Sequence, residues 1–210
     1  MRNLGKIVLH IPAREGSKRV PRKNMRLMNG KPMIGYTIEA VLNANITENC
    51  YVNTDSEEII EFVEKSYPEI QIYLRDKKLC NDQAQSDHFN ADIIRKLQPD
   101  TLIMINPVCP LIEAEDIKNV VNAYQESDSD TIITACSTRM QTFCDGKPVN
   151  IDVTQHLGPS QDNPLITTLN WAVSIWEAEP NSIRSHWRLL RGKNRRYFLL
   201  VKYSTNRCVP

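Results

Sequence analysis

The stretch KIVLHIPAREGSKRVPRKN, residues 6–24, joins a short apolar run to a strongly basic loop. Its first part, residues 6–13, is nearly continuous in apolar character, which is typical of a strand that is covered on both faces of a sheet. The loop behind it holds one glycine, Gly16, and Pro21 prevents a helix from starting tightly after that glycine. The cations of the loop are Arg14, Lys18, Arg19, Arg22 and Lys23. An apolar run followed by these cations predicts a buried strand that ends in a loop able to bind negatively charged groups.

Short apolar runs alternate with helix-like segments over the first two-thirds of the chain. The expected strands are residues 6–13, 49–54, 70–74, 101–106 and 130–137. The expected helices are residues 32–45, 56–67, 86–98 and 113–125. Thr54 and Glu57 have the spacing of a capping box at the start of the second helix. Strands and helices in this order predict an α/β fold with a mostly parallel sheet and helices on both faces.

Length and composition exclude several classes of protein. A chain of 210 residues fits a single domain, 1–210. The 26 Lys and Arg balance the 25 Asp and Glu, so the net charge of +1 does not indicate a nucleic acid or a membrane as partner. The six cysteines have no C-x-x-C spacing, so we expect reduced thiols. Because no stretch has the length of a signal peptide or a membrane span, we expect a cytoplasmic protein.

The basic loop is either a phosphate-binding site or a solvated surface loop, and composition alone does not favour one over the other. In an open parallel sheet the loop after the first strand is the usual place for phosphate, and Gly16 would let the backbone approach a ligand. However, neither G-x-G-x-x-G nor G-x-x-x-x-G-K-[ST] is present, and charge runs are usually solvated surface.

A resemblance favours the phosphate site. The segment IPAREGSKRVPRKN, residues 11–24, resembles the first signature of the acylneuraminate cytidylyltransferases, the CMP-sialic acid synthetases. Three later segments are similar to that family in the same order: NGKPMIGYTIEAVLNA at 29–44, CYVNTDSEEI at 50–59 and YLRDKKLCNDQAQSD at 73–87. The likeness covers about residues 5–137 and fades after that.

The resemblance implies a Rossmann-like nucleotidyltransferase fold and a reaction. CMP would pass from CTP to a nonulosonic, sialic-type acid sugar with release of pyrophosphate, in the presence of Mg²⁺. The implied nucleotide-binding residues are Ala13, Arg14, Gly16, Ser17, Lys18, Lys23, Asn24, Arg75 and Ser86. Arg14, Lys18 and Lys23 are the implied catalytic residues, since the two lysines would stabilise the leaving pyrophosphate. The alternatives are an exposed strand-end charge for Arg75 and a helix N-cap for Ser86.

The acceptor end departs from the family pattern. In INPVCPLI, residues 105–112, Asn106 stands for a Gln, while Val108, Cys109 and Ile112 replace Thr, Ser and Arg. In TLNWAVSIW, residues 168–176, Asn170 matches the family and Trp171 replaces a Gly. Asn106 and Asn170 are therefore the acceptor-binding candidates. The changes predict either a different acceptor or an altered sugar pocket, although Trp171 and Cys109 are also ordinary core residues.

The last third of the chain carries two further expectations. A polar excursion, about residues 139–180, forms a dimer contact in the family, so we expect a homodimer in which Arg139 and Lys147 would reach the partner's pocket or stay exposed. A strand at 169–178 follows the polar part. The basic C-terminus has Asn206 and Arg207 where the family has metal-binding aspartates, so it is expected to be truncated or altered and the metal ligands are unknown.

Three functions remain open at this point. The first is an active cytidylyltransferase for a sialic-type acid. The second is a catalytically impaired relative that binds CTP or CMP. The third is a nucleotidyltransferase for another sugar, such as 3-deoxy-manno-octulosonate.

Overall fold

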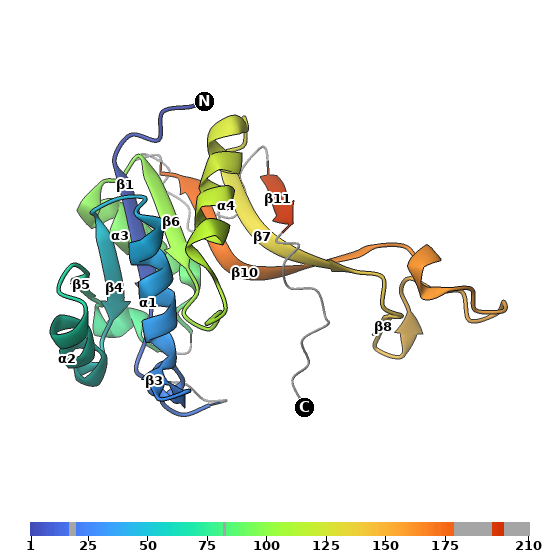
Figure 1. Ribbon diagram of the computed structural model, residues 1–210, viewed down its shortest axis with the longest axis horizontal. Coiled ribbons are helices and arrows are strands. Elements are labelled where there is room, and N and C mark those ends of the chain that lie inside the picture. The colour runs from blue at the N-terminus through green and yellow to red at the C-terminus, as the bar shows by residue number, and fades with distance from the viewer. Residues whose placement is uncertain (17–19, 82, 179–194, 200–210) are drawn as a thin grey trace.

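The computed structural model describes residues 1–16, 20–81 and 83–178, and the backbone of residues 195–199. A seven-stranded sheet with the strand order β11-β7-β10-β6-β1-β4-β5 forms its centre (Figure 1). The strands are β1 (Ile7–Pro12), β4 (Cys50–Thr54), β5 (Gln71–Leu74), β6 (Thr101–Ile105), β7 (Thr131–Thr138), β10 (Ile166–Glu177) and β11 (Arg195–Leu199). Only β10 runs antiparallel to both of its neighbours, β6 and β7. The predicted α/β fold with a mostly parallel sheet is confirmed.

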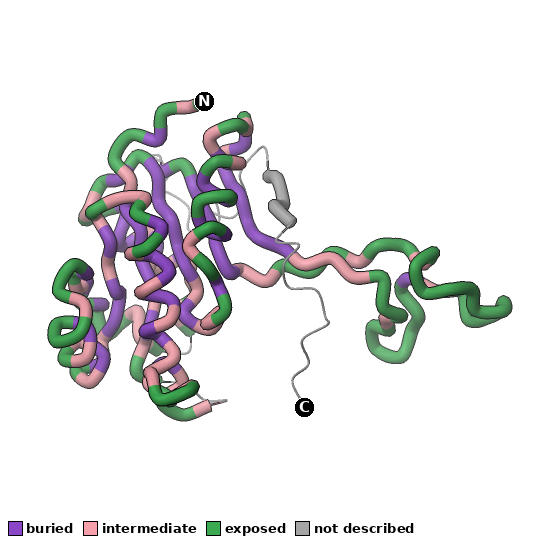
Figure 2. The backbone as a smooth tube through the Cα atoms, viewed as in Figure 1, coloured by how far each residue is buried: buried purple, intermediate pink, exposed green. Residues whose placement is uncertain are grey.

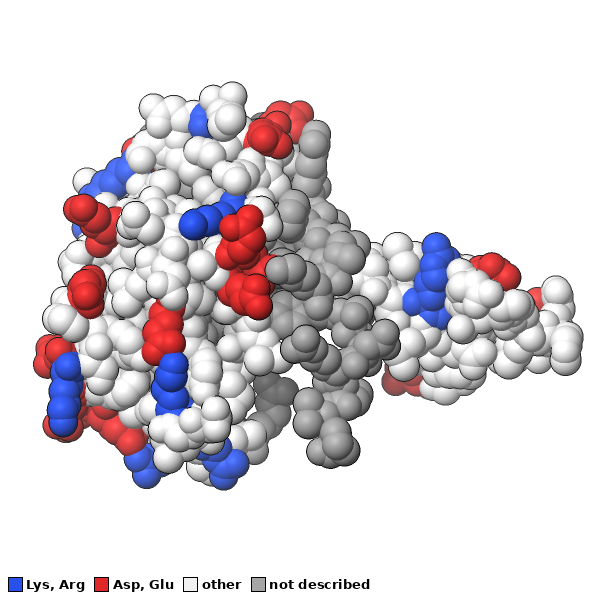
Figure 3. Space-filling view, viewed as in Figure 1, with Lys and Arg blue, Asp and Glu red and all other residues white. Residues whose placement is uncertain are grey.

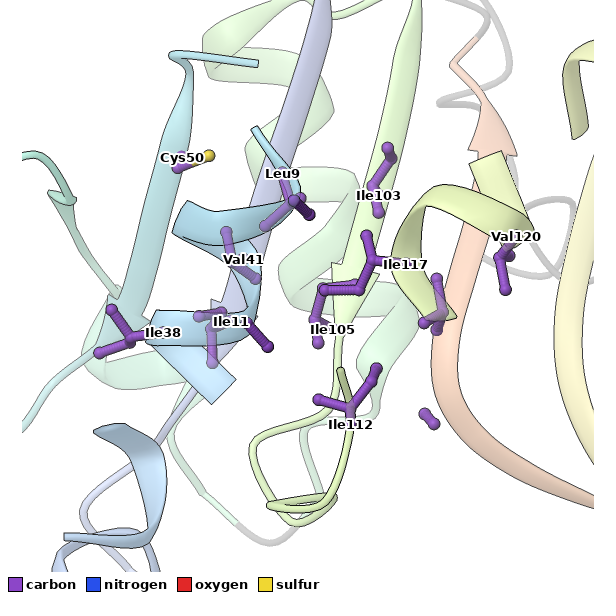
Figure 4. Close-up of a cluster of buried hydrophobic side chains, with 14 of the residues drawn as sticks. Leu9, Ile11, Ile38, Val41, Cys50, Ile103, Ile105, Ile112, Ile117 and Val120 are labelled. Atoms are coloured by element: carbon purple, nitrogen blue, oxygen red, sulfur yellow. The ribbon is translucent and has the colours of Figure 1, made fainter. Parts of the chain in front are cut away.

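Helices cover both faces of the sheet, as the sequence predicted. They are α1 (Met33–Ala44), α2 (Glu57–Ser66), α3 (Ser86–Leu97) and α4 (Ala114–Glu126). Alternate residues of β1 point to opposite faces, because Leu9 and Ile11 belong to one buried cluster and Val8 to another. The first cluster includes α1 and α4, whereas the second includes Ile93 and Ile94 of α3. Figure 4 shows the first cluster, to which α1 contributes Ile38 and Val41 and α4 contributes Ile117 and Val120.

The expected capping box before α2 is wrong. The N-cap residue is Ser56, which makes no side-chain cap hydrogen bond. The Thr54 hydroxyl instead accepts the backbone N–H of Ser56 at 3.1 Å. Thr54 is the last residue of β4, so its side chain stabilises the turn between strand and helix rather than the first turn of the helix.

The polar excursion forms an arm that projects from the body of the molecule. We define the arm as residues 139–165, which contain the hairpin of β8 (Phe143–Cys144) and β9 (Lys147–Pro148) and the short helix η3 (Ser160–Asp162). Figures 1 and 2 show that it extends away from the sheet and is mostly exposed. The end of the expected excursion belongs to the sheet instead, because residues 166–177 form β10, and residues 179 and 180 lie outside the described residues.

Three smaller features bear on the expectations from composition. Acidic and basic side chains are interspersed over the visible face of the body, without a large patch of one sign (Figure 3). Of the helices in the described ranges, none has both the length and the apolar character needed to cross a bilayer. The cysteines in those ranges are free thiols: Cys50, Cys80, Cys109, Cys136 and Cys144.

Candidate functional site

A cavity of about 1030 Å³ lies where β1, β5 and β6 end. Pro12 at the end of β1, Arg75 directly after β5 and Asn106 directly after β6 all line it. Ligands of open α/β sheets bind at this carboxyl edge, where strand order reverses. In this sheet β1 is the strand from which the chain first moves out to β4 and β5 and then crosses to β6. The cavity therefore lies where the fold is expected to bind a ligand.

The structure brings most of the candidate residues together around this cavity. Those that line it are Arg14, Gly16, Lys23, Asn24, Arg75, Ser86, Asn106 and Asn170. Ala13 is fully buried, and its backbone N–H donates to the carbonyl of Asn53 at 2.9 Å rather than being part of the described cavity lining. Ser17, Lys18 and Arg19 lie outside the described residues. The functional roles of all these residues remain predictions.

The loop after β1 divides its described cations between the cavity and the surface. Arg14 lines the cavity and donates from Nη1 to the carbonyl of Cys80 at 3.1 Å. Arg22 has a positive φ of 52° as the N-cap of the short helix η1 (Lys23–Met25), and it forms an exposed ion pair with Glu58. Lys23, the next residue, lines the cavity. The solvated-loop interpretation thus holds for Arg22, while Arg14 and Lys23 are positioned to meet a ligand.

Arg75 is buried, so the alternative of an exposed strand-end charge is wrong. Its side chain is 4% exposed and donates to Asn53 twice, from Nε to Oδ1 at 2.7 Å and from Nη2 to the carbonyl at 2.9 Å. Burial lowers the pKa of this guanidinium. Its hydrogen-bond partners among the described residues are amide oxygens rather than carboxylates. A buried cation held in this way is suited to a ligand that brings negative charge or hydrogen-bond acceptors.

Ser86 is not a helix N-cap. That position belongs to Gln85, whose side chain and that of His88 form a reciprocal capping box at the start of α3. Ser86 is the first residue of the helix and lines the cavity. Its hydroxyl is therefore not needed to cap the helix.

Asn24 adds a hydrogen-bond acceptor without a partner to the cavity lining. It is 8% exposed, and its Oδ1 atom has no hydrogen-bond partner within the described ranges. A buried amide oxygen without a partner is costly unless a ligand or a water satisfies it. Asn24 therefore marks a position where a ligand donor would be stabilised.

Sequence reasoning missed two residues that hold Arg75 in place. Asn53 accepts two hydrogen bonds from it, and the ring of Phe89 lies under its guanidinium, with 4.4 Å from Cζ to the ring centroid. Asn53 could have been found as a polar residue in an otherwise apolar strand. Phe89 gave no signal, because an aromatic residue in an amphipathic helix is read as core.

The part of the cavity next to the acceptor-binding candidates Asn106 and Asn170 is mostly apolar. Pro107, Val108 and Trp171 line it together with Met104. Ile112, which replaces the arginine implied by the resemblance, is 4% exposed. Burial raises the pKa of Cys109, so its thiol remains protonated, as expected of a filler rather than a nucleophile.

The two acceptor candidates use much of their hydrogen-bonding capacity internally. Asn106 Oδ1 accepts the backbone N–H of Val108 at 3.3 Å. Asn170 Oδ1 accepts the Thr134 hydroxyl at 2.6 Å, and its Nδ2 donates to Cys136 Sγ at 3.1 Å. Asn106 Nδ2, in contrast, has no hydrogen-bond partner among the described residues.

The charged residues of the described cavity lining are basic: Arg14, Lys23 and Arg75. The Asp55 carboxylate, which is not among the described lining residues, acts on Arg75 by its charge. No group of three His, Cys, Asp or Glu side chains that would hold a metal occurs in the part of the chain that the structure describes. Asn206 and Arg207, where the resemblance implies metal ligands, lie outside that part. The arrangement is that of an anion-binding site with an apolar extension.

Solved structures confirm the class of fold. CMP:2-keto-3-deoxy-manno-octonic acid synthetase complexed with CTP has a TM-score of 0.63 at 15% sequence identity, over 93% of this chain and 90% of that chain. A 4-diphosphocytidyl-2C-methyl-D-erythritolsynthase from Anaerococcus prevotii has a TM-score of 0.60 at 12% identity, over 93% and 87%. The fold is the Rossmann-like nucleotidyltransferase fold.

The chain belongs to the cytidylyltransferase family, because the sequence model of the family described as Cytidylyltransferase matches residues 8–155. Curated relatives agree with the family resemblance. CMP-N,N'-diacetyllegionaminic acid synthase from Legionella pneumophila is 31% identical over 144 residues, which cover 66% of this chain and 62% of that protein. Pseudaminic acid cytidylyltransferase from Campylobacter jejuni is 36% identical over 130 residues, which cover 60% and 56%. The chain thus spans about three-fifths of the length of these relatives.

Proposed function

We propose that this protein transfers CMP from CTP to a nonulosonic acid sugar and releases pyrophosphate. The observation that carries the proposal is the cavity at the carboxyl edge of the sheet, which Arg14, Lys23 and Arg75 line together. Several cations around one cavity suit a triphosphate. The names of the two bacterial relatives support an acid sugar of the nonulosonic type as acceptor.

The cytosine end would be formed by Arg75, Asn24 and Ser86. Cytosine has a carbonyl and a ring nitrogen that accept hydrogen bonds and an exocyclic amine that donates them. The donors of Arg75 suit the acceptors, and the unsatisfied Oδ1 of Asn24 suits the amine. Ser86 would donate or accept at the same edge of the base.

The phosphate end would be formed by the loop after β1. Arg14, Lys23 and the backbone at Gly16 line the cavity, and Ser17 and Lys18 would complete the cradle. In the reaction, the anomeric hydroxyl oxygen attacks the α-phosphorus and releases its proton to solvent, while the bond from the α-phosphorus to the bridging oxygen of pyrophosphate breaks. Negative charge then develops on pyrophosphate, and Lys18 and Lys23 would stabilise it.

Mg²⁺ is expected from the family resemblance, but the described residues do not fit it. A hard divalent cation prefers oxygen ligands, above all carboxylates. The described cavity wall offers cations, amides and apolar groups instead. The assignment of Mg²⁺ and its ligands remains a prediction, and no step above depends on it.

A second candidate function is a CTP- or CMP-binding protein without turnover. The observation in its favour is the acceptor end, where Ile112 is buried and the Asn170 amide is bonded within the protein. Transfer to 3-deoxy-manno-octulosonate is a third candidate, and a solved synthetase for that sugar acid shares the fold at 15% identity.

We also propose that the arm forms a homodimer contact. It carries a set of exposed apolar side chains: Met140, Phe143, Val149, Val153, Leu157 and Leu165. Apolar side chains gathered on one projecting segment are typical of an interface. Arg139 donates to the carbonyl of Asn163 within the arm, which favours a structural role over one in a partner's pocket. The cytoplasmic location remains a prediction.

Two measurements test the proposed reaction. CTP should raise the melting temperature more than UTP does, because a ligand that binds only the folded state stabilises it. Pyrophosphate release should require both CTP and an acid sugar. A CTP-dependent shift without release across a broad panel of acid sugars would favour the binding protein, and no shift at all would contradict both candidates.

A further inference from the structure

Trp171 has a backbone conformation that is rare for a bulky residue. Its φ is 56°, in the left-handed region that ordinarily favours glycine. The register between β10 and β7 shifts at the same place, between Leu169 and Ser174. A β-bulge of this kind re-aims a side chain relative to a regular strand.

Hydrogen bonds from neighbouring side chains fix the backbone on both sides of Trp171. Before it, the Asn170 amide is bonded to the Thr134 hydroxyl and to Cys136 Sγ. After it, the backbone N–H of Ala172 donates to Asn170 Oδ1 at 3.1 Å, and that of Val173 donates to Thr134 Oγ1 at 3.0 Å. Rare backbone conformations persist where the surrounding structure determines them in this way, and they cluster at functional sites.

Trp171 lies between the cavity and a buried apolar cluster. Trp171 lines the cavity with Pro107 and Val108, and it also packs against the buried cluster that contains Met104. The cations of the cavity, in contrast, come from the loops after β1 and β5. The wall formed by Trp171, Pro107 and Val108 thus has no charged group, and Asn106 and Asn170 are the polar lining residues next to it in sequence.

We infer that Trp171 determines acceptor specificity by providing an apolar wall for a methyl or acyl group of the sugar. This inference rests on the proposed function, because it places the acceptor next to a bound nucleotide. A hydroxyl group turned toward this wall would lose its hydrogen bonds to water without replacement. A methyl or acyl group would instead gain from leaving water. The acceptor class is therefore an acid sugar with an apolar substituent where a hydroxylated analogue carries a hydroxyl.

The test uses a pair of nonulosonic acids that differ only in a terminal CH₃ or CH₂OH group. Their dissociation constants are measured by calorimetry with a non-hydrolysable CTP analogue bound, so that the result does not depend on turnover. The wild-type protein should prefer the methyl compound by roughly tenfold to a hundredfold, the range within which an apolar pocket discriminates. Trp171→Gly should reduce the preference to less than about threefold, while Trp171→Phe should keep most of it.

A control separates this effect from relief of backbone strain. Gln98→Gly changes another residue with positive φ, 46°, at the end of α3 and outside the described cavity lining. It should leave the preference unchanged. Equal affinity of the wild-type protein for the two acids, no binding of either, or a preference kept in Trp171→Gly would overturn the inference.

Failure of the proposed function would look different. In that case the CTP analogue itself would give no binding heat and no rise in melting temperature. If the analogue binds but the acceptors are not distinguished, the nucleotide site stands and the role of Trp171 does not. Should Trp171→Gly fail to fold, the selectivity of the wild-type protein and of Trp171→Phe still decides the question.

Discussion

The guanidinium carbon of Arg75 lies 4.4 Å from the centroid of the Phe89 ring. Arg75 follows β5 and Phe89 belongs to α3, so a strand end and a helix on one face of the sheet together position the cation. Asn53, in β4, accepts two hydrogen bonds from the same guanidinium. The cation is thus fixed before any ligand arrives, which reduces the entropy lost on binding.

Substitution of Arg75 should weaken CTP binding. Arg75→Lys keeps the charge but loses the planar group that spans Asn53 and Phe89, so we expect a loss of roughly tenfold to a hundredfold in affinity for CTP, ~1.5–3 kcal/mol. Calorimetry measures the change. Arg95→Lys is the matched control, because Arg95 is 58% exposed on α3 and pairs with Asp92 outside the described cavity lining. Wild-type affinity in Arg75→Lys would contradict the assigned role.

Lys23 and Arg22 provide a second comparison between adjacent cations. Lys23 lines the cavity, whereas Arg22 is 71% exposed and pairs with Glu58. Lys23→Ala should reduce pyrophosphate release by roughly tenfold or more, because a charge-assisted contact to phosphate is lost. Arg22→Ala should change it by less than about threefold, since exposed ion pairs contribute little. Equal effects of the two substitutions would mean that the loop acts only through its overall charge.

The arm should determine the oligomeric state. Phe143 is 55% exposed in β8, and Phe143→Asp would place a charge in the proposed dimer contact. We expect sedimentation to show a dimer for the wild-type protein and a monomer for this variant at the same concentration. Leu27→Asp, on the body of the molecule, is the control because Leu27 is 69% exposed. A wild-type monomer, or a dimer that persists in Phe143→Asp, would count against the arm as interface.

His10 should make the protein sensitive to acid. It is fully buried in β1, its ring lies 6.1 Å from that of Phe89, and burial together with the Arg75 charge lowers its pKa to about 3. The unfolded chain therefore takes up a proton below about pH 6.5 that the folded protein does not, so stability falls as pH drops from about 6.5 toward 3. The slope from this one group is at most about 1.4 kcal/mol per pH unit.

Urea unfolding at several pH values tests this dependence. His10→Leu should have a shallower loss of stability between pH 6.5 and pH 4 than the wild-type protein, whatever its stability at pH 7. His156→Leu, which replaces an exposed histidine in the arm, is the matched control. An unchanged slope in His10→Leu would show that other groups dominate acid unfolding.

Much of the fold could be predicted from the sequence, because the periodicity of apolar residues and the position of turn residues are features of short segments. The central-sheet strands and the α-helices from residue 6 to 137 were found to within a few residues, since buried strands read as apolar runs and the helices as amphipathic ones. The short strands β2 (Leu27–Met28) and β3 (Lys31–Pro32) were not predicted. The antiparallel direction of β10 was not predicted, because strand direction depends on the course of the chain through the arm. The position of the N-cap of α3 at Gln85 rather than Ser86 was also not predicted, since both residues fit the local pattern.

The candidate site was predicted unevenly for a similar reason. Arg14, Lys23, Asn24 and Arg75 stand in motifs, and the structure places them around one cavity. Asn53 and Phe89 act only through their contacts with Arg75, and a contact between β4, α3 and the end of β5 cannot be read from local sequence. The positive φ of Trp171 is likewise a product of the bulge between β7 and β10.

The bulge in β10 also has a structural consequence. Before it, Leu169 pairs with Ala135 in the ribbon that leads to the arm, and after it Ser174 pairs with Ile133 within the central sheet. Figure 1 shows that β7 and β10 both continue from the central sheet toward the arm. Of these two strands, β10 also contributes Asn170 and Trp171 to the described cavity lining. The arm, in which we propose the dimer contact, and the part of the cavity lined by Trp171 are therefore connected through a single strand.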